Sequence, residues 1–195
     1  MTISNRYRRR LIIMVKEPRP GRVKTRLAQD IGKTQAAWWF RHTALELMRR
    51  LRDPRWQLIV AVTPDVEGLK SRVWPSDLMR MPQGQGGLGA RMSGLLAAAP
   101  KGPSVIIGAD IPGIKRHHIE TAFRALGPND MVFGPAQDGG FWLVGSQRRK
   151  PMRPNIFENV RWSSETTLAD TLTGLPDQRI GLVNMLADVD TVADL

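Results

Sequence analysis

The stretch Ser104-Val105-Ile106-Ile107-Gly108-Ala109-Asp110-Ile111-Pro112-Gly113 decides the fold of this chain. Its apolar first half predicts a buried strand, which is followed by a single carboxylate, Asp110, and a Pro-Gly turn. In open α/β sheets, ligands bind in the crevice beyond the carboxyl ends of the parallel strands. A carboxylate at that place is suited to hold Mg²⁺ against phosphate oxygens, which favours nucleotide chemistry. The alternative is an Asp that only caps a turn or the next helix.

Strands and helices alternate along the rest of the chain. This alternation is typical of a mostly parallel sheet with helices on both faces, so we expect an α/β protein with a three-layer α/β/α sandwich. We expect one domain over residues 1–195, with a basic N-terminal extension over residues 1–10. The predicted strands are residues 11–15, 58–62, 78–81, 104–108, 131–134, 141–145 and 179–185, and the predicted helices are residues 34–51 (capped by Thr34), 66–73, 88–99, 115–126 and 163–172 (opened by Ser163 or Ser164).

The chain is strongly basic, with 29 Lys and Arg against 18 Asp and Glu and a formal net charge of +11. Such a balance suits phosphate-bearing ligands, nucleic acid or an anionic membrane surface. The basic residues are dispersed and few aromatics lie among them, so we do not expect specific nucleic-acid binding. The absence of cysteine excludes disulfides, thiolate nucleophiles and Cys-ligated metal centres. The apolar run before Lys16 is too short for a signal peptide or a membrane span, and we expect a cytoplasmic protein.

A basic loop, Lys16–Arg26, follows the first predicted strand and therefore lies at the ligand edge of the sheet. Arg22, Lys24 and Arg26 alternate with uncharged residues, so an extended loop presents these three cations on one side. If the segment enters a helix instead, Arg22 and Arg26 share a face near its start, where anions are favoured. Both geometries suit a diphosphate or triphosphate, although the glycine spacing of a Walker A loop is missing. A solvated basic loop is the alternative.

A glycine-rich loop, Gln83–Arg91, precedes a predicted helix. Repeated glycine lets the backbone pass close to a flat or phosphorylated ligand. The amides of Gln83 and Gln85 offer donor and acceptor groups that could read the edge of a base.

Two acidic segments are candidates for the remaining chemistry. Asp138-Gly139-Gly140 lies between two predicted strands, where it could direct a carboxylate into the cleft and leave space for an acceptor. Asp-Gly is also a strong hairpin signal, and the hairpin is the favoured interpretation. Near the C-terminus, Asp190 of Asp188-Val189-Asp190 could supply a second metal ligand or cap a last short helix. Elsewhere, Trp74 and Trp142 look exposed in the sequence, which hints at an interface.

These segments, in this order, resemble the DUF2064 family of glycosyltransferase-A-like proteins, within the nucleotide-diphospho-sugar transferase superfamily. Lys16–Leu27 resembles the signature K-x-P-x-x-G-x-V-K-T-R-L, and Ile107–Gly113 resembles I-G-T-D-C-P-G. Gly134–Gly145 resembles G-P-A-E-D-G-G-Y-Y-L-L-G, Arg161–Leu168 the W-S-T-E segment and Asp188–Leu195 the ending D-V-D-T-P-E-D-L. The same order is similar to phospholactate guanylyltransferase and to molybdenum-cofactor nucleotidyltransferases.

The resemblance implies a bound nucleotide and Mg²⁺ or Mn²⁺, with Asp110 as the main metal ligand and Asp190 as a second one. It implies that Lys24 and Arg26 clamp phosphates, that the glycine-rich loop reads the base and that the Asp138 segment lines the acceptor side. The full set of candidates comprises the catalytic residues Lys24, Asp110 and Asp138, the nucleotide-binding residues Lys16, Gly21, Arg22, Lys24, Thr25, Arg26, Gln83, Gly84 and Gly86, and the acceptor-binding residues Asp138, Gly139 and Gly140.

The function expected from these features is metal-dependent transfer of an NMP group from an NTP to a small phosphorylated or sugar-like acceptor. The three cations of the basic loop fit a triphosphate, and Asp110–Pro112 lacks the second aspartate of a D-x-D motif. The alternatives are a glycosyltransferase that uses an NDP-sugar, with Asp138 as the base on the acceptor hydroxyl, and a non-catalytic nucleotide-binding protein. The glycine-rich loop departs from the resembled family, which commonly has acidic residues where this chain has Gln85, Gly87 and Ala90.

Overall fold

The computed structural model describes residues 8–149 and 156–186. The strands in these ranges are β1 Arg10–Lys16, β2 Gln57–Thr63, β3 Met79–Pro82, β4 Ser104–Gly108, β5 Met131–Pro135, β6 Phe141–Ser146 and β7 Ile180–Leu182. The helices are α1 Leu27–Ile31, α2 Lys33–Leu51, α3 Asp65–Lys70, α4 Leu88–Ala98, α5 Arg116–Ala125 and α6 Thr167–Thr173. No helix in the described ranges has the length and apolarity that crossing a membrane requires.

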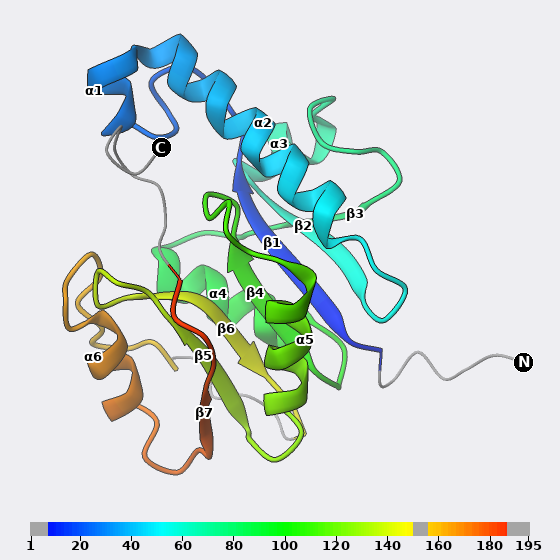
Figure 1. Ribbon diagram of the computed structural model, residues 1–195, viewed down its shortest axis with the longest axis vertical. Coiled ribbons are helices and arrows are strands. Elements are labelled where there is room, and N and C mark those ends of the chain that lie inside the picture. Colours follow the sequence, from blue (N-terminus) through cyan, green and yellow to red (C-terminus); the bar gives the residue numbers. More distant parts are fainter. Residues whose placement is uncertain (1–7, 150–155, 187–195) are drawn as a thin grey trace, which may run out of the picture.

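The described strands form one mixed sheet in the order β3-β2-β1-β4-β6-β5-β7 (Figure 1). β1 pairs in parallel with β2 and β4, β2 with β3, and β5 with β7. β6 runs antiparallel to both of its neighbours, β4 and β5. The carboxyl ends of the six parallel strands and the amino end of β6 therefore meet at one edge of the sheet.

Helices cover both faces of the sheet, as alternating side chains of the buried strands require. In β1, Leu11, Ile13 and Val15 belong to one buried cluster, which contains the apolar faces of α2 and α5. Ile12 belongs to a second cluster on the opposite face, with residues of α4 and partly buried residues of α6. Figure 1 shows α2 and α5 in front of the sheet and α4 behind it. The predicted three-layer α/β/α sandwich is thus confirmed.

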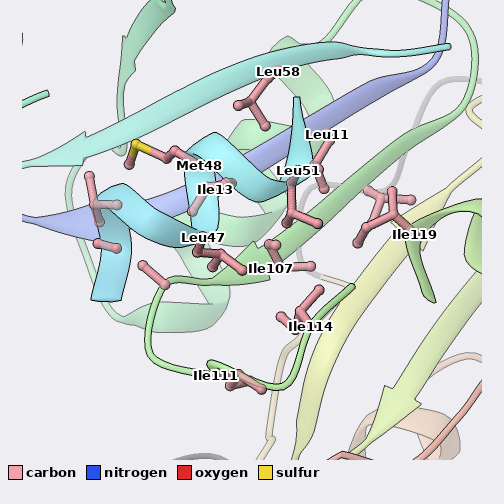
Figure 2. Packing of buried hydrophobic residues seen from close by; sticks show 14 of the residues in the cluster. Leu11, Ile13, Leu47, Met48, Leu51, Leu58, Ile107, Ile111, Ile114 and Ile119 are labelled. Atoms are coloured by element: carbon pink, nitrogen blue, oxygen red, sulfur yellow. The ribbon is translucent and has the colours of Figure 1, made fainter. Parts of the chain in front are cut away.

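The loop that follows β4 is anchored in the first of these clusters. Figure 2 shows Ile111 and Ile114 from this loop packed beside residues of α2 and β4, including Leu47 and Ile107. The side chains of Ile111 and Ile114 are 4% and 0% exposed. Burial of two isoleucines on either side of the Pro-Gly turn fixes the path of the chain immediately after Asp110.

Helix starts differ from the sequence prediction. α2 begins at Lys33 after Gly32, which has the left-handed φ of +86°, so Thr34 lies inside the helix and does not cap it. The short helix α1 in front of it was not predicted. α6 begins at Thr167, later than predicted, because Ser163 adopts a left-handed φ of +57° and residues 163–166 form turns.

Three buried side chains correct further expectations. Arg10, predicted to belong to the basic extension, is the first residue of β1 and is 2% exposed. Burial and the nearby Arg8 and Arg148 lower its pKa. Trp74 and Trp142 are 2% and 3% exposed, so neither forms an exposed interface. The indole N–H of Trp142 donates to a backbone carbonyl, which satisfies its polar atom inside the core.

Candidate functional site

The carboxyl-terminal edge of the sheet brings together segments that lie far apart in the sequence. Lys16 ends β1, Gln83 follows β3, Asp110 follows β4 and Asp138 follows β5. Phe141, the first residue of β6, lies at the same edge because β6 is antiparallel. All five residues line one cavity of about 410 Å³. The lining of this cavity is mostly apolar; its charged groups come from the strand ends, and the hydroxyl groups of Ser163 and Thr167 come from the segment that leads into α6.

A second cavity, of about 310 Å³, lies beside the first and is lined by the basic loop. The two cavities share Lys16, Phe40 and Asp110 in their linings. Four cations line the second cavity together with one carboxylate, that of Asp110. The complete lining of this smaller cavity is Lys16, Arg22, Val23, Lys24, Thr25, Arg26, Phe40 and Asp110.

Lys24 and Asp110 form an ion pair between the two cavities. Lys24 Nζ lies 2.9 Å from Asp110 Oδ2, and the two side chains are 7% and 36% exposed. Lys24 has a left-handed φ of +45°, a conformation that is uncommon for a non-glycine residue. The neighbouring Val23 is 5% exposed and belongs to the core, so it fixes this turn of the basic loop. The basic loop is thus built to hold the ammonium of Lys24 against the end of β4.

The position of Asp110 depends on the residues around it. A Cβ on Gly108 would lie 2.8 Å from Asp110 Oδ1, so glycine leaves room for the carboxylate to turn back over the strand end. From α2, Arg50 donates from Nε to the carbonyl of Ile114 over 2.9 Å and from Nη2 to that of Pro112 over 2.6 Å. Arg50 thereby clamps both ends of the turn that follows Asp110, and sequence analysis did not single it out.

The glycine-rich loop is tied to the sheet through Gln83. Its side chain is buried, and Nε2 donates to the carbonyls of Val15 and Ala61, both over 2.9 Å. These bonds use both amide hydrogens of Gln83. The expected donation from Gln83 to a base is therefore not possible, and only its carbonyl oxygen can take part in recognition. Gly84 and Gly86 have left-handed φ angles of +81° and +91°, which explains the glycines by backbone conformation.

The Asp138 segment forms the predicted hairpin turn between β5 and β6. The N–H of Ala136 donates to the carbonyl of Gly140 over 3.0 Å, and the N–H of Gly140 donates to Asp138 Oδ1 over 2.9 Å. Gly139 has a φ of +84°, and a Cβ there would collide with the backbone of Glu165. Asp138 and Gly140 line the larger cavity, so the hairpin and the cleft-lining carboxylate occur together.

The remaining candidate residues differ in whether they line one of the two cavities. Arg22, Thr25 and Arg26 line the smaller cavity with Lys24, so the structure brings these four candidates together. Four candidate glycines, namely Gly21, Gly84, Gly86 and Gly139, line neither of these two cavities. Asp190 lies outside the described residues.

More than half of the chain matches one known protein family. The family model for DUF2064, described as uncharacterized proteins conserved in bacteria, matches residues 46–164. The chain belongs to DUF2064. The matched region contains the glycine-rich loop, Asp110 and the Asp138 turn, whereas the basic loop precedes it. No curated protein sequence matches this DUF2064 chain.

Solved structures share the fold of this DUF2064 protein. A candidate nucleotide-diphospho-sugar transferase from Desulfovibrio desulfuricans is 26% identical, with 96% of this chain and 84% of that chain covered and a TM-score of 0.82. CMP:2-keto-3-deoxy-manno-octonic acid synthetase in complex with CTP is 13% identical, with coverages of 95% and 94% and a TM-score of 0.58. Mycobacterium tuberculosis Rv0371c in complex with manganese is 16% identical, with coverages of 96% and 95% and a TM-score of 0.53. The last two likenesses concern the fold alone.

The Asp110 carboxylate is a donor that suits a hard divalent cation whose other ligands come from a bound anion and water. Mg²⁺ is typically bound by one or two carboxylates together with substrate phosphates and water. Asp110 offers one partly exposed carboxylate beside a cavity lined by cations. No cluster of three or more His, Asp or Glu side chains that could hold a metal occurs in residues 8–149 and 156–186. A cage made only of described side chains is therefore not what this site provides.

Several cavity-lining residues escaped sequence analysis. Phe141, Trp162 and Thr63 line the larger cavity, and Ser163, expected to open a helix, lines it too. The position of Phe141 directly after Asp-Gly-Gly was a usable signal, because the first residue of an antiparallel strand returns to the edge that the preceding strand left. For Trp162 the signal was its place in the segment that resembles W-S-T-E.

Proposed function

We propose that this protein is a cytoplasmic, metal-dependent nucleotidyltransferase-like enzyme that transfers an NMP group from an NTP to a small phosphorylated or sugar-like acceptor. One observation carries the proposal: a cavity lined by four cations adjoins a larger, mostly apolar cavity, and Asp110 lines both. This division suits the two reactants, because the phosphates need positive charge, whereas the nucleoside and the acceptor need a mostly apolar pocket with a few polar groups.

The smaller cavity would take the phosphates. Lys16, Arg22, Lys24 and Arg26 surround it, and together they offset the charge of an NTP. In phosphoryl and nucleotidyl transfer, catalysis rests on positioning and on stabilising charge that moves to the leaving group. These four side chains would hold the leaving pyrophosphate in this cavity.

The reaction would consist of one displacement. An oxygen of the acceptor forms a bond to the α-phosphorus, and the bond from that phosphorus to the α–β bridging oxygen breaks with its electron pair on pyrophosphate. Where the acceptor oxygen belongs to a hydroxyl group, Asp138 would accept its proton. Asp110, with Asp190 as a second proposed ligand, would hold Mg²⁺ or Mn²⁺. When bound, the metal supplies charge neutralisation at the phosphate oxygens.

The shared fold accommodates a nucleotide and a metal ion in other proteins. One of them is a synthetase bound to CTP, and another is bound to manganese. The residues of this chain that would take a nucleotide and a metal lie at the ligand edge of the shared fold.

Glycosyl transfer from an NDP-sugar is the second candidate. The Desulfovibrio desulfuricans protein, a candidate nucleotide-diphospho-sugar transferase, favours it. The same cations would then hold the leaving diphosphate, and Asp138 would act on the acceptor hydroxyl. A non-catalytic nucleotide-binding protein, the third possibility, would use the same cavities without turnover.

Thermal melting with NTPs and with NDP-sugars, each with and without Mg²⁺, tests the proposal. We expect one NTP to raise the melting temperature only when Mg²⁺ is present, and the corresponding NDP-sugar to have a smaller effect. Asp110→Asn should remove the metal-dependent part of the shift. Asp77→Asn serves as the control. The carboxylate of Asp77 is 60% exposed and pairs with Arg52, the residue directly after α2. A larger shift with NDP-sugars would favour glycosyl transfer, and metal-dependent binding without turnover would favour the binding protein.

A further inference from the structure

An aromatic wall lines the larger cavity beside Asp138. It consists of Phe141 and Trp162, whose ring centroids lie 6.1 Å apart in an edge-on arrangement. Phe157 supports both rings, at 5.9 Å from Trp162 and 6.2 Å from Phe141. Phe133, which is fully buried, contacts Phe141 at 5.2 Å from the core side. The wall is therefore held from behind by packed rings.

The segment that bears Trp162 is fixed by several independent contacts. Arg161 donates from Nε and Nη2 to the carboxylate of Asp170 over 2.9 and 2.8 Å. The hydroxyl of Thr167 donates to the carbonyl of Arg161 over 2.7 Å. On α4, a Cβ on Gly89 would lie 2.8 Å from the indole ring, so this glycine provides the seat of Trp162.

Ser163 completes this side of the cavity in an unusual conformation. Its φ of +57° is left-handed. This conformation costs a non-glycine residue free energy, and residues that adopt it cluster at ligand sites. Ser163 and Asp138 place a hydroxyl and a carboxylate in the lining of the cavity that the aromatic wall also lines. An apolar ring face beside hydrogen-bonding groups is a suitable surface for a molecule with an apolar face and a rim of hydroxyls.

The charges of the two cavities are separated. Among the described lining residues of the larger cavity, Lys16 is the sole cation, and it also lines the smaller cavity. Asp138 is the charged group on the side of the aromatic wall. A phosphate group placed there would meet a carboxylate and aromatic rings without a cation, which is unfavourable for an anion in a partly enclosed site.

We propose that Phe141, Trp162 and Ser163 form, with Asp138, an acceptor subsite that takes an uncharged polyhydroxylated compound and excludes phosphorylated acceptors. This inference rests on the proposed function and narrows its acceptor class. A hydroxyl group must lose its proton as its oxygen bonds to phosphorus, and the Asp138 carboxylate is placed to receive that proton. An acceptor that attacks through an ionised phosphate oxygen has no proton to lose, so the carboxylate would not assist it, and an acceptor that attacks through a hydroxyl but carries a phosphate elsewhere would meet the negative charge of Asp138.

Direct binding tests the subsite without requiring turnover. The probes are matched pairs, glycerol with glycerol phosphate and glucose with glucose phosphate. Their binding is followed by saturation-transfer NMR on the protein with Mg²⁺ and a non-hydrolysable NTP, and again on the protein alone. We expect the uncharged member of a pair to bind about tenfold more tightly, because the phosphorylated member meets Asp138. Separate calorimetry of NTP binding reports on the proposed function itself, so its failure is distinguishable from failure of the subsite.

Three variants assign the preference to the named residues. Trp162→Ala should weaken binding of the uncharged probe by about tenfold, and Trp162→Phe should restore most of it. Trp38→Ala, which removes an indole that is 59% exposed on α2, is the matched control and should have no effect. Asp138→Lys should reverse the preference toward the phosphorylated probe. Tighter binding of a phosphorylated probe to the unmodified protein, no binding of any uncharged probe, or unchanged binding in Trp162→Ala would overturn the proposal.

Discussion

Lys24 Nζ lies 2.9 Å from Asp110 Oδ2, so the cation expected to bind phosphate and the carboxylate expected to bind metal neutralise each other. The pair joins the basic loop after β1 to the loop after β4, which are distant in the sequence and adjacent at the edge of the sheet. A ligand that supplies both a metal and phosphates gives each of the two groups a new partner. Metal and NTP should therefore bind cooperatively, because each would release the group that the other requires.

Lys24 is expected to couple metal binding to NTP binding. In Lys24→Met, Asp110 loses its ion-pair partner, so Mn²⁺ alone should bind about tenfold more tightly than it does to the unmodified protein. Affinity for an NTP with Mg²⁺ should fall about tenfold, whereas affinity for the corresponding nucleoside should change little. Titration calorimetry measures all three. Lys70→Met, an exposed substitution at the end of α3, is the control. Equal losses for NTP and nucleoside would mean that Lys24 has only a structural role.

Arg50 is expected to act on the site through the loop that it clamps. Arg50→Ala removes the donors to the carbonyls of Pro112 and Ile114, and we expect a loss of about 1–3 kcal/mol in unfolding free energy. Because this loop carries Asp110, the metal-dependent component of NTP binding should weaken about three- to tenfold, beyond any loss of folded protein.

The comparison for Arg50 is its neighbour on α2. Arg49→Ala changes an exposed side chain and should leave both stability and NTP binding unchanged. Arg50→Lys, which keeps the charge but loses the forked donors, should recover little of the metal-dependent binding. Full recovery with lysine would show that charge, and not the clamp, is what matters.

A glycine pair tests the packing of the hairpin turn. Gly139→Ala forces a Cβ against the backbone of Glu165 at a left-handed φ, and should cost about 2–4 kcal/mol of unfolding free energy. Gly94→Ala adds a methyl group to an exposed helical position with nothing within 4 Å, and should stabilise by about 0.5–1 kcal/mol. Urea denaturation provides both values. A tolerated alanine at residue 139 would mean that the turn and the Glu165 segment can separate.

The acid stability of the Trp162 segment should depend on Asp170. Hydrogen bonds from Arg161 lower the pKa of Asp170 from 3.8 to about 2. The ionised carboxylate thus stabilises the folded state: its contribution is complete above the unfolded pKa and is lost as the pH falls toward 2. Asp53, paired with Arg55, titrates in the same window.

The contribution of Asp170 is separated from that of Asp53 by comparing the stability of the unmodified protein with that of a variant at residue 170. The gap in urea midpoint between the unmodified protein and Asp170→Asn should be constant above about pH 5 and should shrink as the pH falls from 4 to 2. In the same range, iodide should increasingly quench the part of the tryptophan fluorescence that Trp162→Phe lacks, because the segment that carries Trp162 loosens. A gap that does not vary with pH would mean that Asp170 contributes no ionisation-linked stability.

Local patterns were sufficient for the strands and for the three layers. The β-branched runs before Lys16 and before Asp110 are long enough to specify buried strands, and β4 has the predicted bounds. Helix starts were less predictable, because Thr34 and Ser163 are good capping residues whose use depends on the preceding turn. The expected exposure of Trp142 was wrong because its indole contacts the chain segment after β7. The residues next to Trp142 in the sequence do not indicate this distant contact.

The loops of the candidate site could be predicted from the sequence, but the contacts between their side chains could not. Glycine spacing and clustered charge identify loops at a sheet edge, and the fold brings such loops together. Three features of the site are tertiary contacts. Lys24 pairs with Asp110, Gln83 donates its amide hydrogens to β1 and β2, and Arg50 donates to the loop after Asp110. Their geometry arises only once the sheet order is fixed.

The reversed direction of β6 divides the edge of the sheet into two parts with separate supports. The cations and Asp110 are carried by the end of β1 and by the loops that follow β1 and β4, whereas Asp138 and Phe141 are carried by the tip of the β5–β6 hairpin. An exchange of this tip leaves the crossover connections of the other part in place, provided that the new tip keeps the packing against Glu165 and the aromatic rings around Phe141. Relatives of this chain could therefore acquire new acceptors by grafting a different tip between β5 and β6, and the same exchange offers a route to redesigning the protein.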